Sequence, residues 1–157
     1  MHKPIKADLV MPWIVTGLMF FMLLSYIVIC HLMAEQLQQH WPEDQRVLIR
    51  TVLYVTAIVL FPVTNLIRHI QLRLNETMPG DKPAKRRYLL TVIVSMLLIE
   101  SVGVLGFIMF MLGDGYNTLY ILTGLSMLGL FLYRPKPEEY SRVLRALAAK
   151  KNEDLTS

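Results

Sequence analysis

Glu100 is the residue whose type and position most suggest chemistry. It lies in the middle of a 25-residue apolar stretch, Tyr88–Leu112, that contains no other acidic or basic side chain. Such a stretch is long enough to cross a bilayer as a helix. A carboxyl near the bilayer midplane costs about 2.5–3.5 kcal/mol, even on the insertion scales that give the lowest costs. A chain that retains one usually holds it in a protein-lined, hydrated or protonated niche, so Glu100 is a candidate proton- or cation-binding residue.

We expect Glu100 to be protonated at neutral pH. No Arg or Lys lies at a comparable depth in the other apolar stretches, and a buried carboxyl without a cation favours its neutral form. Three interpretations stay open: a hydrogen-bonded acid that fixes helix packing or an oligomer contact, a proton or cation site, and a carboxyl exposed to a water-filled cavity. The polar groups available at that depth are all hydroxyls, namely Ser25, Thr56, Thr64, Thr123 and Ser126.

Small residues accompany the carboxyl at helical spacing. Gly103 and Gly106 follow Glu100 at steps of three, so the three residues fall along one side of a helix. Glycines in a membrane helix let a neighbouring backbone approach closely. Gly124 and Gly129, with Ser126 between them, are expected to play the same part in the next apolar stretch. The pattern predicts a packed helix interface around Glu100.

The stretch LLIESVGVLGFIMFML resembles the carboxylate helix of the rotor-ring proteolipid, the c subunit, of rotary ATPases. In both, a mid-membrane glutamate is followed six positions later by glycine, here Glu100 and Gly106. The resemblance covers about sixteen of the 157 residues and implies that Glu100 binds H⁺ or Na⁺. The proteolipid's partner helix is rich in glycine, whereas the second apolar stretch here has none and contains Pro62. The resemblance therefore implies an ion-binding carboxylate and not a rotor ring.

Composition places these residues in a membrane protein. Hydrophobic residues make up 54% of the chain and charged ones only 18%, confined to short blocks between long apolar runs. Helices satisfy their own backbone hydrogen bonds in lipid, so the runs predict an all-α integral membrane four-helix bundle. The expected transmembrane domain covers residues 1–134 and a tail covers 135–157. Its spans are predicted at about 9–33, 47–74, 88–112 and 116–133.

The distribution of basic residues predicts the orientation. Fourteen of the sixteen Lys and Arg residues lie in the N-terminus, the connection between the second and third spans, and the tail. Only Arg46 and Arg50 lie on the opposite side. The positive-inside rule then predicts a bacterial inner-membrane protein with both termini in the cytoplasm. The basic cluster before the third span predicts lipid-headgroup anchoring, with an acidic partner as the alternative; its members are Lys85, Arg86 and Arg87.

The tail contains a short amphipathic pattern. Pro137 followed by Glu138 and Glu139 is typical of a helix start, because proline suits the first turn and acids favour its positive end. Apolar residues then recur at helical spacing from Tyr140 to Leu147. We expect a cytoplasmic helix that lies on the membrane surface or against a partner.

Other chemistry is not indicated. The sequence has no phosphate-binding loop, nucleophile elbow or paired catalytic carboxylates, and Cys30 is its only cysteine. We expect no enzyme activity, no metal, no cofactor and no nucleic-acid partner. The predicted function is an accessory or scaffold subunit of a membrane complex, formed with further copies or with another membrane protein in the lipid bilayer. The alternative is a small proton- or cation-coupled transporter, or a channel-like subunit, that uses Glu100.

Overall fold

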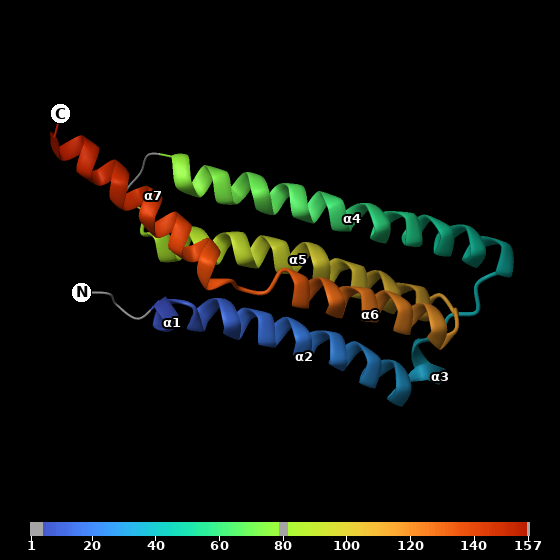
Figure 1. Cartoon of the computed structure of the whole chain (residues 1–157). Coiled ribbons are helices and arrows are strands. Elements are labelled where there is room, and N and C mark those ends of the chain that lie inside the picture. Colours follow the sequence, from blue (N-terminus) through green and yellow to red (C-terminus); the bar gives the residue numbers. More distant parts are fainter. Residues whose placement is uncertain (1–4, 79–81, 157) are drawn as a thin grey trace.

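The described residues, 5–78 and 82–156 of the computed structural model, fold into helices and contain no strand (Figure 1). This confirms the all-α helical bundle. The helices, in chain order, are α1 Ile5–Asp8, α2 Val10–Leu32, α3 Ala34–Leu37, α4 Glu43–Thr77, α5 Ala84–Met111, α6 Tyr116–Leu132 and α7 Pro137–Thr156.

Three helices, α2, α4 and α5, are long and apolar enough to cross a membrane. α6 has 17 residues and reaches that length only together with α7, from which a short break and a bend of 45° separate it. The described chain therefore has three candidate spans, or four if the bent pair counts as one. Each predicted span coincides with a helix. α4 extends beyond the expected 47–74 at both ends, to Glu43 and to Thr77, and its first turn holds the acidic residues Glu43 and Asp44.

α5 is the central helix of the bundle. α6, α4 and α2 all pack against it (Figure 1). Half of the apolar segment of α5 is buried inside the protein, against 22% for α2 and 11% for α4. A polar side chain on α5 therefore meets protein in most directions, whereas one on α4 mostly meets the surroundings.

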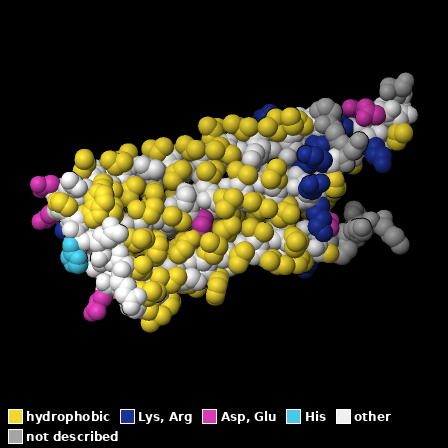
Figure 2. All heavy atoms as spheres, turned by 180° about the vertical axis from the view of Figure 1, so that it is seen from behind, with side chains coloured by type: hydrophobic (Ala, Val, Ile, Leu, Met, Phe, Trp, Pro, Cys, Tyr) yellow, Lys and Arg dark blue, Asp and Glu magenta, His cyan; other side chains and the backbone are white. Residues whose placement is uncertain are grey.

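The bundle has two chemically different ends. α1, α7 and the connection between α4 and α5 lie at one end, which we call the basic end (Figure 1). Lys and Arg side chains gather at one end of the apolar surface, and apolar side chains cover the face between the ends (Figure 2). Arg46 and Arg50 lie at the opposite, far end, where they contact the turn between α5 and α6. The helices nearest the two termini therefore lie at the same end of the bundle as the connection between α4 and α5 (Figure 1), and the cytoplasmic orientation of that end stays a prediction.

The tight turn at the far end sets α5 and α6 side by side. Gly113 has a positive φ of 93°, and a Cβ there would lie 2.5 Å from the Gln39 carbonyl oxygen. Only glycine adopts this conformation without strain and leaves room for that backbone. The turn is then held by Arg50, whose guanidinium lies 3.0 Å from the Asp114 carboxylate.

α7 packs against the bundle's own helices at the basic end. Its first turn holds Pro137 and two glutamates, as expected. Tyr140 and Val143 are buried in the core shared with α5, and the Tyr140 hydroxyl donates a 2.9 Å hydrogen bond to Asp8. Burial, followed by the hydrogen bond and charge of Asp8, raises the pKa of Tyr140 to about 12. The amphipathic pattern is confirmed, but its most buried residues contact protein and not a membrane surface.

Candidate functional site

Glu100 lies inside the bundle because it shares the buried side of α5. Ile99 and Gly103, which flank it on that side, are buried. Glu100 itself is only 4% exposed, even though it lies near the middle of a candidate membrane span. The carboxyl is therefore enclosed within a single copy of the chain, so it needs no second subunit to leave the lipid.

Few polar groups lie near the Glu100 carboxyl. The hydroxyl of Tyr26 on α2 lies close enough to interact with it, and the Tyr26 ring packs against Phe107, with centroids 5.4 Å apart. Neither carboxyl oxygen of Glu100 has a hydrogen bond of good geometry within the described residues. Both oxygens are buried, and a buried charge without a partner is costly. The arrangement is chemically suited to a neutral carboxyl that holds a proton.

The hydroxyls expected near Glu100 form no hydrogen bond with its carboxyl. Ser126 donates a 2.8 Å hydrogen bond to the Ile99 carbonyl, which ties α6 to α5 one residue before the carboxyl. Thr123 is buried, and its hydroxyl has no partner in the described chain. The remaining three each donate to a carbonyl one turn back in their own helix, namely Ser25, Thr56 and Thr64. None of these five hydroxyls therefore forms the hydrogen bond to the Glu100 carboxyl that a structural, hydrogen-bonded acid would need.

The small residues form a close α5–α6 contact beside the carboxyl. A Cβ at Gly106 would lie 3.0 Å from Leu122 Cβ and 3.4 Å from the Leu119 carbonyl oxygen. A Cβ at Gly103 would collide with a methyl of Leu23 and lie 3.4 Å from the Ser126 hydroxyl. These two glycines and Ser126 therefore lie where the spacing predicted. Gly129 of α6, which the spacing also indicated, packs in the same way against Ile99.

Gly124 does not join that contact. It is exposed, and no atom lies within 4 Å of the position where its Cβ would be. Helical geometry explains the difference, because Ser126 is two residues further on and faces another side of α6. Within the chain, the predicted packing of Gly124 around Glu100 is not met.

A second polar cluster lies at the basic end. Arg68 of α4 is 4% exposed, and its guanidinium lies 2.6 Å from the Glu139 carboxylate of α7. The Tyr88 hydroxyl donates a 3.1 Å hydrogen bond to the same carboxylate and accepts one of 2.8 Å from the Lys136 amide. The Arg68 guanidinium also lies 5.9 Å from the centre of the Tyr133 ring. This cluster joins α4, α5 and α7.

The sequence reasoning missed the role of Arg68 and counted it only as an orienting charge. One signal was present. Ala57, Thr64, Arg68 and Leu72 recur at steps of seven, four and four, and they form the buried side of α4. A basic residue within such a series indicates a buried partner. Nothing in the spacing of α7 identified Glu139 as that partner.

The three predicted headgroup anchors differ in their surroundings. Arg87 donates hydrogen bonds to the carbonyls of Met78 and Lys82 and so closes the connection between α4 and α5. Lys85 lies 3.6 Å from the Asp8 carboxylate. Arg86 is exposed. The geometry leaves Arg86 as the residue of the three most available to a lipid headgroup.

Residues 5–78 and 82–156 hold no group of three His, Cys, Asp or Glu side chains that could bind a metal ion. No family model, no curated protein and no solved structure matches the chain. The resemblance of the Glu100 helix to the rotary ATPase proteolipid therefore stays a prediction.

Proposed function

We propose that this protein is an accessory or scaffold subunit of a complex in a bacterial inner membrane, with the basic end in the cytoplasm. The orientation is supported by the charge asymmetry, because basic residues favour the cytoplasmic side. Fourteen of the sixteen Lys and Arg residues lie, in the sequence, before the first span, around the connection between the second and third spans, or after the fourth. A gene fusion to a reporter that is active only in the cytoplasm, placed after residue 157, tests this orientation directly.

The observation that carries the scaffold role is the outer side of α6. Ile121, Gly124 and Leu128 are exposed at steps of three and four, with open space over the glycine. In lipid, helices associate through close packing, for which a small residue between larger ones provides a notch. A glycine that faces only lipid lacks this benefit and costs helix stability. The outer side of α6 therefore suits a helix of a neighbouring subunit.

α4 adds a second outward-facing polar feature. Asn65 is exposed among apolar residues such as Leu66, and its amide has no hydrogen bond within the described chain. Asn65 lies one turn before Arg68, near the basic end of the apolar face, where a polar group of another helix is a suitable partner for its amide. A partner subunit supplies such a group, whereas acyl chains do not.

Cysteine cross-linking in native membranes tests the scaffold role. Cys30 is the only cysteine, so a Cys30→Ala background leaves only introduced thiols. We expect Ile121→Cys to form a defined cross-linked product. Leu97→Cys on α5, exposed to a similar degree, is the matched control and should form none. Gly124→Leu should abolish the product without unfolding the chain, because its side chain enters open space. Equal cross-linking at both positions, or a monomer in native membranes, contradicts the proposal.

A proton- or cation-coupled role for Glu100 is the second candidate, and one specific observation favours it. Both carboxyl oxygens are buried, and the Tyr26 hydroxyl lies close enough to interact with the carboxyl but forms no hydrogen bond of good geometry with it. Infrared difference spectra of the wild type against Glu100→Gln, recorded in lipid, isolate this carboxyl. A carboxyl band that titrates between about pH 6 and 8 supports proton exchange. A band that persists beyond pH 9, with normal assembly of the Gln variant, favours the scaffold role alone.

A further inference from the structure

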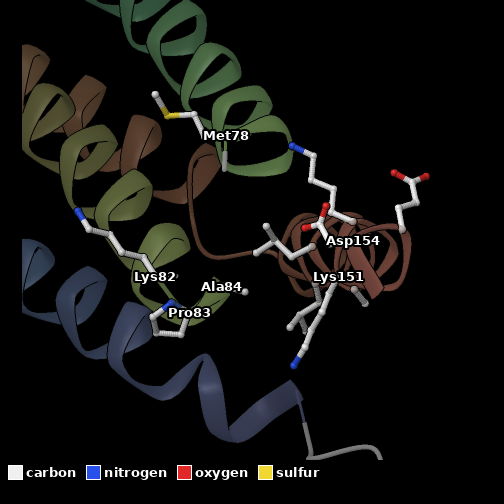
Figure 3. A pocket seen from close by; sticks show the side chains of 11 residues that line it. Met78, Lys82, Pro83, Ala84, Lys151 and Asp154 are labelled. Carbon is white, nitrogen blue, oxygen red and sulfur yellow. The ribbon is translucent and has the colours of Figure 1, made fainter. Parts of the chain in front are cut away.

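A pocket of about 790 Å³ lies at the basic end, between the start of α5 and α7 (Figure 3). Its walls include apolar side chains from both elements, among them Pro83, Leu144 and Leu147. Such walls suit hydrocarbon and do not suit a small hydrophilic anion by itself.

Lysines surround this pocket. Lys150 donates a hydrogen bond to the Thr77 carbonyl at the end of α4, so its ammonium already has a partner. Lys82 and Lys151 also line the pocket, and their ammonium groups have no partner among the described residues. Figure 3 shows these two side chains on different elements around the pocket. Two available positive charges therefore lie beside apolar walls.

Two acidic residues line the pocket as well. Glu153 and Asp154 lie near the end of α7, and Asp154 already interacts with another group. They disfavour an anion at that edge. Lys151 shares the end of α7 with these acids, so an anionic group in the pocket is best placed between Lys151 and Lys82, on the side of the start of α5.

We propose that the pocket binds one anionic phospholipid, such as phosphatidylglycerol, from the leaflet at the basic end. The location supports a lipid, because the pocket lies at the ends of helices long enough to cross a membrane, where headgroups are found. Lys82 and Lys151 contact the phosphate, and Leu144 and Leu147 contact the upper part of an acyl chain. Basic pockets at the cytoplasmic ends of membrane helices recognise anionic headgroups by this combination of charge and apolar surface.

Native mass spectrometry of the detergent-solubilised full chain, titrated with phosphatidylglycerol and separately with phosphatidylcholine, tests the proposal. We expect one tightly retained phosphatidylglycerol and no comparable phosphatidylcholine. The double variant Lys82→Gln/Lys151→Gln should weaken phosphatidylglycerol binding by about twenty-five-fold, since each lysine near the membrane surface contributes roughly fivefold. Both lysine side chains are exposed, so their replacement should not disturb the fold and the circular dichroism spectrum should stay unchanged.

The matched control removes equal charge from the other side of α7. Arg142 and Arg145 are exposed and do not line the pocket, so Arg142→Gln/Arg145→Gln should change binding by less than about twofold. If both double variants lose the same amount of phosphatidylglycerol affinity, the lipid responds to overall positive charge and not to this pocket, which overturns the proposal. Retention of phosphatidylcholine as tight as that of phosphatidylglycerol also overturns it. Displacement of the lipid by millimolar inorganic phosphate would show a site for free anions and likewise contradict a lipid site.

Discussion

Glu139 and Glu100 are both largely enclosed by protein, and their surroundings differ sharply. Glu139 lies 2.6 Å from the Arg68 guanidinium and accepts a hydrogen bond from Tyr88. Glu100 has no charged partner and no hydrogen bond of good geometry in the described chain. A carboxylate paired in this way holds helices together, so it is not available to bind a proton or a cation. A carboxyl left unpaired in the interior keeps its capacity to bind a proton or a cation.

The far end repeats the paired arrangement. Asp114 is 6% exposed, lies 3.0 Å from Arg50, and accepts a 2.6 Å hydrogen bond from the Thr118 hydroxyl. Both ends of the bundle are therefore closed by satisfied carboxylates, while the acidic residue between them is unsatisfied. The difference lies in the partners, because only the ends contain arginines. The following experiments test whether this contrast separates structural from functional acids.

The largest expected effect comes from breaking the pair at the basic end. Arg68→Met leaves Glu139 without its cation, and removing one partner of a buried pair costs about 3–5 kcal/mol. The free energy of unfolding in bicelles, measured by steric trapping, gives the value. Arg73→Met on the exposed side of α4 is the matched control and should change it by less than about 0.5 kcal/mol. Equal effects of the two variants would show that the pair does not hold α7 to α4.

A smaller effect is expected where α5 and α6 touch. A Cβ at Gly129 would lie 2.6 Å from Ile99 Cγ2, so Gly129→Ala overpacks the contact and should cost about 1–3 kcal/mol. Gly124→Ala has open space and should leave unfolding unchanged or raise its free energy by about 0.5–1 kcal/mol. Thermal unfolding of both variants in the same detergent makes the comparison. A destabilised Gly124→Ala monomer would contradict the outward placement of this residue.

Glu100→Gln should change the free energy of unfolding by less than about 1 kcal/mol, because the Tyr26 hydroxyl beside the carboxyl can interact with an amide as well. The same steric-trapping assay compares it with Arg68→Met. A loss as large as that of Arg68→Met would mean that Glu100 holds the fold. The contrast between the two acidic residues would then fail.

The smallest effect concerns pH. Burial and Asp8 raise the pKa of Tyr140 from 10.0 to about 12, so the protonated hydroxyl is favoured in the folded protein. The docking of α7 should be unaffected below pH 10 and weaken as the pH rises from 10 toward 12. Ultraviolet difference spectra of the wild type against Tyr140→Phe measure this tyrosinate. Ionisation near pH 10 would show that α7 leaves Tyr140 exposed to water.

The helical bundle could be predicted because the bilayer-length apolar runs and their polar connections are local properties of the chain. The same holds for α7, whose Pro137 and first-turn glutamates indicate a helix start. The docking of α7 could not be predicted. It depends on Arg68 and Glu139, which lie 71 positions apart and carry no shared pattern. The placement of Gly124 was missed because spacing identifies a face without saying what lies against it.

For the candidate site, the sequence alone determined that Glu100 lies inside an apolar helix with glycines beside it and no cation at its depth. Those are facts of composition and helical period. Only the tertiary structure decided which neighbours the carboxyl meets. α2 brings Tyr26 toward it, while Ser126 donates to the Ile99 carbonyl instead. The reason is physical: hydroxyls in helices find backbone carbonyls nearby, and whether one remains for a distant carboxyl depends on how the helices are rotated against each other.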